Sequence, residues 1–182
     1  MKRLMVVASV LVLLGGSLSL LAGCGGDTGK AKAYMQQGDK IQAELQTGFT
    51  ELTPSMKKVF ANATDEASKK AGVEEVKALT AGLNAKADEA IAEYGKIEGL
   101  SGVEDYKKYA ALVIEEDKSV KDIMAATDKY FDELLPMMSL DNVTEEQVTE
   151  VTTTYQKEME ELTKKLGEAE NEANQLKKDK KL

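Results

Sequence analysis

Apolar residues recur every three or four positions along most of the chain after residue 30. This spacing places them on one face of an α-helix, so four such runs predict four long helices. The runs cover residues 30–70, 73–97, 103–135 and 148–176. Amphipathic segments of this length in one small domain bury their apolar faces only against one another. The pattern therefore predicts an all-α fold, an elongated antiparallel helical bundle of about four long helices.

Glycine and proline positions predict where the helices end. Ala71-Gly72 marks the expected break between the first two helices, and the glycines of residues 98–102 indicate a short connection to the third. Pro136 is expected to end the third helix. Pro54 interrupts the first apolar run, where it removes a backbone donor. Because the apolar stripe continues on both sides of Pro54, we expect a kink there rather than a split.

Two pairs of residues match the capping box that starts a helix, Ser101 with Glu104 and Thr144 with Gln147. They predict the starts of the third and fourth helices. From Tyr155 onward the fourth run has heptad spacing, and its other positions are almost wholly charged or polar. The apolar stripe of this helix is therefore narrow, and its charged end can project beyond the bundle.

The N-terminus has the layout of a secretory signal peptide. A basic start, Met1-Lys2-Arg3, precedes a mostly apolar stretch over residues 4–22, which holds small residues toward its end. A membrane-spanning helix needs about 20 apolar residues, so the length of this stretch alone does not separate the two interpretations. The end of this stretch and the cysteine that follows it separate the two interpretations.

Leu21-Ala22-Gly23-Cys24 resembles the lipobox of bacterial lipoproteins. The resemblance implies lipid transfer to the thiol of Cys24 and cleavage between Gly23 and Cys24. It also implies a diacylglyceryl group, and two acyl chains give stable anchoring where one chain does not. The expected division is a removed signal peptide over residues 1–23, a lipidated cysteine and flexible tether over residues 24–30, and a helical bundle domain over residues 31–182. A cysteine that follows an apolar stretch by chance is the competing interpretation.

Composition narrows the classes of function. Removal of residues 1–23 takes away only two basic side chains and leaves 22 basic and 32 acidic ones, a formal charge of −10. An acidic body disfavours a nucleic-acid partner. The chain has no His, its single cysteine is Cys24, and it has no G-x-S-x-G or phosphate-loop motif. We therefore expect no enzyme activity, no metal site and no cofactor.

The densest acidic cluster is Glu115-Glu116-Asp117 in the third predicted helix. Consecutive helical residues fan out around the axis and cannot converge on one cation, so a solvated helix face is expected. Asp117 differs from its neighbours because it interrupts the apolar stripe. It can pair with a lysine, line a small polar cavity or lie at the edge of the stripe, and we expect the edge. It remains a candidate for ligand or partner contact.

Three further features are candidates for binding. Met137 and Met138 follow Leu134-Leu135-Pro136 and can form an adaptable docking patch, although an apolar plug at the bundle end is preferred. Tyr109 and Tyr130 lie off the apolar stripes. Exposed tyrosines could stack on the sugar rings of a cell wall, but most of the tyrosines are expected to be partly buried with the hydroxyl in water. Residues 177–181 hold four lysines, which can contact wall polymer or lipid headgroups but are expected mainly to stabilise the helix C-terminus.

The leading functional hypothesis is a non-enzymatic binding or scaffold module in the cell envelope. It would be held on the extracytoplasmic face of the cell membrane, or on the outer membrane of a Gram-negative cell, by the lipid on Cys24. Its expected partner is an envelope protein or a wall polymer. One alternative is a small-ligand-binding or sensory bundle with a pocket near Asp117. A weaker alternative is a glycan-acting enzyme that uses two carboxylates.

Overall fold

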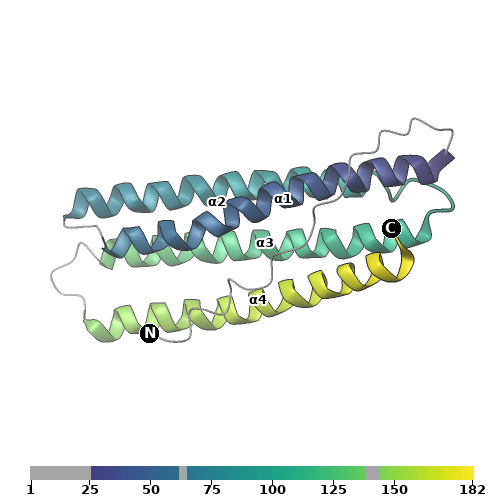
Figure 1. Ribbon diagram of the computed structural model, residues 1–182. Helices are drawn as coiled ribbons and strands as arrows, with labels where there is room; N and C mark the ends of the chain where they lie inside the picture. The colour runs from purple at the N-terminus through teal and green to yellow at the C-terminus, as the bar shows by residue number, and fades with distance from the viewer. Residues whose placement is uncertain (1–25, 62–64, 138–143) are drawn as a thin grey trace.

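The computed structural model describes residues 26–61, 65–137 and 144–182. These residues form four helices and no strand: α1 (Gly26–Ala61), α2 (Glu66–Gly95), α3 (Glu104–Met137) and α4 (Glu145–Lys180). Each helix runs antiparallel to the next along one long axis (Figure 1). The prediction of an all-α, elongated antiparallel bundle of four long helices is confirmed.

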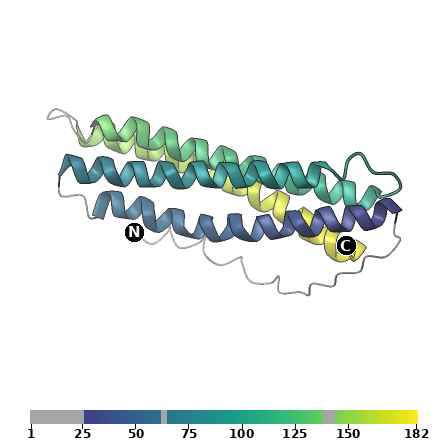
Figure 2. The same ribbon diagram turned by 90° about the horizontal axis from the view of Figure 1, so that it is seen from above.

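The helices pack in chain order, α1 on α2, α2 on α3 and α3 on α4. No described Cα atom of α1 lies within 8 Å of a described Cα atom of α4. In Figure 2, α4 starts beside α3 and crosses obliquely toward the side of α1 at its end. The seam between α1 and α4 is therefore bridged by long side chains rather than by close backbone packing.

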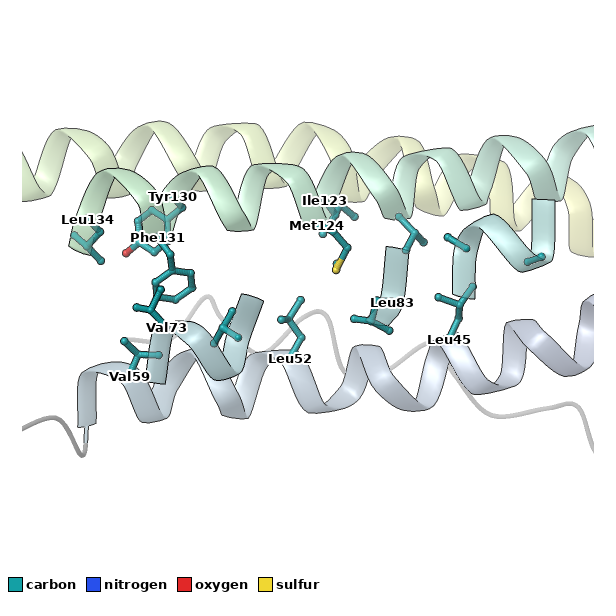
Figure 3. Close-up of a cluster of buried hydrophobic side chains, with 14 of the residues drawn as sticks. Leu45, Leu52, Val59, Val73, Leu83, Ile123, Met124, Tyr130, Phe131 and Leu134 are labelled. Atoms are coloured by element: carbon teal, nitrogen blue, oxygen red, sulfur yellow. The ribbon is translucent and has the colours of Figure 1, made fainter. Parts of the chain in front are cut away.

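The interior consists of two apolar clusters along the axis. The larger one lies between α1, α2 and α3 and includes Leu45, Leu52, Leu83, Met124 and Phe131, with partly buried side chains of α4 against it (Figure 3). The smaller one closes the end where α1 begins and α4 ends, and it joins all four helices through residues such as Met35, Tyr94, Tyr109 and Ala173. Removal of this apolar surface from water is the main stabilising contribution.

The first helix begins at Gly26, so the prediction of a flexible tether over residues 24–30 is wrong for residues 26–30. The side chain of Asp27 explains the early start. Its carboxylate accepts a hydrogen bond from the backbone N–H of Ser101 at 2.9 Å and contacts the Lys30 ammonium at 3.1 Å. The hydrogen bond from Ser101 lowers the pKa of Asp27. A carboxylate in the first turn also favours the helix dipole.

The predicted break at Ala71-Gly72 is wrong, because α2 begins at Glu66 and continues through both residues. Asp65 caps this helix, and its carboxylate accepts a hydrogen bond from the backbone N–H of Ser68 at 2.8 Å. Gly72 serves close packing instead of a turn. A Cβ atom at Gly72 would lie 3.3 Å from Cγ2 of Val59 on α1.

The two prolines lie inside helices. α1 is continuous through the exposed Pro54, so the helix does not split there. Pro136 lies in the last turn of α3, which ends at Met137 and not at the residue before the proline. Assignments of helix ends commonly differ by one or two residues.

One of the two predicted capping boxes is confirmed. Thr144 accepts from the backbone N–H of Gln147 while the Gln147 side chain accepts from the backbone N–H of Thr144, and α4 follows. The box at Ser101 is wrong, because α3 begins only at Glu104. Gly102 has a φ of 71°, a left-handed conformation that cannot extend a helix back to Ser101.

α3 has a broader buried face than a single stripe, because it packs against α2 on one side and α4 on the other. Tyr109 and Tyr130, predicted to lie off the stripe, are therefore buried. The Tyr130 ring stacks on the Tyr155 ring of α4, with 4.3 Å between their centroids. By contrast, α4 has one fully buried residue, Ala173, among its described positions. None of the described helices combines the length and the apolar character needed to cross a membrane.

Candidate functional site: a polar network inside the bundle

One carboxylate, that of Asp39 on α1, joins side chains from the other three helices. Its Oδ1 accepts hydrogen bonds from the hydroxyl of Tyr94 on α2 at 2.7 Å and from the hydroxyl of Tyr109 on α3 at 3.0 Å. Its Oδ2 accepts one from the ammonium of Lys177 on α4 at 2.7 Å. The side chains of Asp39 and Lys177 are only 23% and 18% exposed. This mostly buried ion pair is a direct link across the seam between α1 and α4.

A glycine makes room for this arrangement. The ring of Tyr94 lies flat against α1 at Gly38, and a Cβ atom there would lie 2.5 Å from Cζ of Tyr94. The rings of Tyr94 and Tyr109 meet edge to face, with centroids 6.0 Å apart. The Lys177 ammonium lies 5.3 Å from the centroid of the Tyr109 ring, which adds a cation–π contact.

The two tyrosine hydroxyls remain protonated donors. Burial raises the pKa of Tyr94 and that of Tyr109, and the adjacent Asp39 charge raises both further. Both hydroxyls therefore donate to Asp39 across the physiological pH range. The positive charge that balances this carboxylate comes from Lys177.

A second carboxylate group lies further along α3. Asp117 is fully buried; its Oδ1 accepts a hydrogen bond from the side-chain amide of Gln42 on α1 at 2.6 Å, and its Oδ2 has no hydrogen-bond partner. Burial raises the pKa of Asp117 to about 7, and the hydrogen bond from Gln42 opposes this rise. Asp117 thus carries little or no charge at mildly acidic pH.

The pKa of the neighbouring Glu116 is also raised in this part of the bundle. Burial raises its pKa to about 8, and the negative charges of Asp117, Glu170 and Asp39 add to this effect in that order. Burial also raises the pKa of Glu170 on α4. Three acidic side chains from α1, α3 and α4 therefore raise the pKa of Glu116, and Glu116 and Asp117 take up protons near neutral pH.

Two hollows of the described surface lie elsewhere. Both lie between α3 and α4, and neither is lined by Asp39, Glu116 or Asp117. The pocket that the ligand-binding alternative places near Asp117 is not among them. No group of three His, Cys, Asp or Glu side chains within the described residues is arranged to hold a metal ion. The network joins the helices of the bundle and binds protons.

This proton binding has a measurable consequence for stability. Glu116 and Asp117 titrate near pH 4 in an unfolded chain and near 8 and 7 in the folded one. The folded protein holds more protons between these values, so the free energy of unfolding falls as the pH rises from about 4 to about 8. Each such group contributes a slope of about 1.4 kcal/mol per pH unit over its range. Asp117→Asn is expected to remove its part of this slope.

Urea unfolding tests this expectation. The free energy of unfolding is measured from about pH 5 to about pH 9, in steps of roughly one pH unit. As the pH rises, the free energy of unfolding of Asp117→Asn should increase relative to that of the parent. Asp122→Asn, an exposed substitution on the same helix, is the control and should follow the parent. Parallel curves for the parent and Asp117→Asn would contradict the assignment.

The predicted site residues have different outcomes. Gly23, Cys24 and Met138 lie outside the described residues. Met137 is half-buried at the end of α3, about 30 Å along the helix from Asp117 at 1.5 Å per residue. The expectation that Asp117 lies at the edge of the stripe is wrong, because it is buried between α3 and α1. The solvated-face expectation for the acidic cluster holds for the exposed Glu115 and not for Asp117.

Sequence reasoning missed the partners of this network, although helical spacing marks them. Asp39 follows the buried Met35 by four positions, which places it on the same face of α1. Glu170 and Lys177 flank the buried Ala173 by three and four positions in α4. Charged residues that share a face with buried ones were the available signal. The expectation that residue 177 acts mainly on the helix C-terminus is incomplete, because Lys177 reaches α1.

In comparisons with protein-family models, curated proteins and solved structures, no match to the chain was found.

Proposed function

We propose that the protein is a lipoprotein of the cell envelope, held on the extracytoplasmic face of a membrane through Cys24, and that it acts as a non-enzymatic binding or scaffold module. The observation that carries this proposal is the position of the lipobox-like sequence relative to the fold. Leu21-Ala22-Gly23-Cys24 is followed by a single residue, Gly25, before α1 begins. Almost no chain thus separates the predicted signal peptide from the bundle. This is expected for a bundle that is presented directly at a membrane.

The shape and composition of the bundle support a scaffold. α1 has 36 residues, which corresponds to about 54 Å at 1.5 Å per residue. The outer face of α4 is almost entirely charged or polar along its length. The mostly buried Asp39 and Lys177 form an ion pair that links α1 to α4. Such a body offers long, water-exposed helix faces to an envelope protein or a wall polymer.

Cross-linking in intact cells, followed by purification of the detergent-extracted protein, tests the binding function. A specific envelope protein or wall polymer should be enriched over a control lipoprotein that carries the same residues 1–25 in front of an unrelated helical domain. This control separates partners of the bundle from neighbours of any lipid-anchored protein. Recovery of the same material with both proteins would contradict the binding function.

A further inference from the structure

Three parts of the chain meet at one end of the bundle. They are the start of α1, the connection between α2 and α3, and the end of α4 (Figure 1). Asp27 of α1 accepts a hydrogen bond from Ser101 of the connection, and Lys180 of α4 contacts Asp105 of α3 at 3.4 Å. Leu182 packs against the apolar cluster of this end. The end of α4 is therefore part of a closed surface, and the expectation that it can project beyond the bundle is wrong.

This end has the opposite charge balance from the rest of the protein. We define it as residues 26–39, 93–109 and 177–182, which hold nine lysines and seven acidic side chains. The remainder of residues 24–182 holds 13 basic and 25 acidic side chains. The formal charge is thus +2 for this lysine-rich end and −12 for the remainder. This distribution separates a basic end from an acidic remainder along the axis of the bundle.

Four lysines of this end are free to act on a partner. Lys32, Lys108, Lys178 and Lys181 are exposed, and none forms an ion pair with another described residue. They come from α1, α3 and the end of α4, so they surround the end instead of following one helix. Their arrangement favours a flat anionic surface over a narrow ligand.

The covalent chain limits how far this end can lie from an anchor at Cys24. One residue separates Cys24 from Gly26, the first residue of α1. The Cα atoms of residues 24 and 26 are therefore at most about 7 Å apart, since an extended chain spans at most about 3.6 Å per residue. A lipid on Cys24 would place the lysine-rich end at the headgroups of the bilayer.

From this juxtaposition we propose that the bundle stands end-on upon an anionic bilayer, with the lysine-rich end bound to anionic lipid headgroups. The proposal rests on the lipid anchor of the proposed function. Basic residues next to a membrane are attracted by anionic lipids over about a Debye length. The sides of the bundle carry the excess of acidic residues and are repelled, which disfavours a bundle that lies flat. The opposite end is then held about 50 Å above the bilayer, from the length of the helices at 1.5 Å per residue.

Lysine footprinting of the full lipidated protein on vesicles tests this orientation. The purified protein is bound to phosphatidylcholine vesicles, with or without phosphatidylglycerol, and treated with an amine-acylating reagent. Lys32, Lys108, Lys178 and Lys181 should lose reactivity severalfold on the anionic vesicles only. Lys57, Lys129 and Lys157, exposed near the opposite end, should react equally on both.

Matched variants separate charge from position. Lys178→Glu with Lys181→Glu should abolish the protection of Lys32 and Lys108, whereas Lys129→Glu with Lys157→Glu should leave it intact. Equal reactivity of the end lysines on both kinds of vesicle would overturn the proposal while the anchor stands. Protection of Lys118 and Lys165, exposed near the middle of α3 and α4, would indicate a bundle that lies flat and would also overturn it.

Two further outcomes of the footprinting would overturn the proposal in different ways. Protein that does not float with neutral vesicles lacks the anchor, and this result overturns the proposed function and the end-on orientation together. Protection that appears only when an anionic wall polymer is added to neutral vesicles, and not with anionic lipid, would assign the lysine-rich end to the polymer and refute the lipid contact.

Discussion

A Cys24→Ala chain is expected to incorporate no labelled palmitate in a bacterial host, whereas the parent chain is labelled. The thiol of Cys24 is the only one in the protein, so the substitution removes the sole thioether site for a diacylglyceryl group. Cleavage between Gly23 and Cys24 depends on this modification and should fail as well. The variant should therefore keep residues 1–23 and migrate as a larger protein, and the effect is all-or-none rather than graded.

Ser17→Ala is a control for this experiment, because it changes a small residue of the same leader and leaves Leu21-Ala22-Gly23-Cys24 intact. It should be labelled and processed like the parent. Membrane fractionation alone is a weaker measurement, since the apolar residues 4–22 of an unprocessed chain can themselves retain it in a membrane. Equal labelling of the parent and Cys24→Ala would contradict the assignment of Cys24.

Gly38→Ala is expected to lower the free energy of unfolding by about 1–3 kcal/mol, the usual cost of overpacking a core. The added methyl group would lie 2.5 Å from Cζ of Tyr94, inside van der Waals contact. Tyr94 is fully buried and its hydroxyl is bound to Asp39, so the ring cannot move without loss of that hydrogen bond. The loss is a large share of a typical total stability of about 5–15 kcal/mol.

Gly82→Ala is the matched control, because Gly82 is exposed within α2 and nothing lies within 4 Å of a Cβ atom there. It should raise the free energy of unfolding by about 0.5–1 kcal/mol through the better helix propensity of alanine. Urea unfolding monitored by circular dichroism measures both variants. Equal stabilisation by the two substitutions would show that Tyr94 does not pack on Gly38 as described.

The apolar periodicity predicted the four helices because each buries a face with regular spacing. It failed at positions where packing between helices decides the outcome. Tyr109 lies off the predicted stripe and yet is buried, because α3 packs against both α2 and α4 whereas a single stripe serves a helix with one neighbour. Gly72 favours a break in the sequence pattern, whereas in the structure it allows close approach of α2 to Val59. These roles depend on the partner helix, which local sequence does not specify.

The polar network was harder to predict for a similar reason. Asp117 interrupts an apolar stripe, and this signal marked it as unusual. Its partner Gln42 is 75 positions away, and Asp39 and Lys177 are 138 positions apart. Charged residues are so frequent in the chain that their pairing across helices becomes visible only when the helices are packed. The predictions at Cys24, which rest on the resemblance to a lipobox, lie outside the described residues and stay predictions.

The attachment of the protein is tested most directly by the mass of its N-terminal peptide after detergent extraction from membranes and proteolysis. The expected peptide begins at Cys24 and carries the mass of a diacylglyceryl group on its sulfur. A peptide that begins at Met1, or a Cys24 without lipid, would contradict the membrane anchor and with it the proposed presentation of the bundle at the membrane.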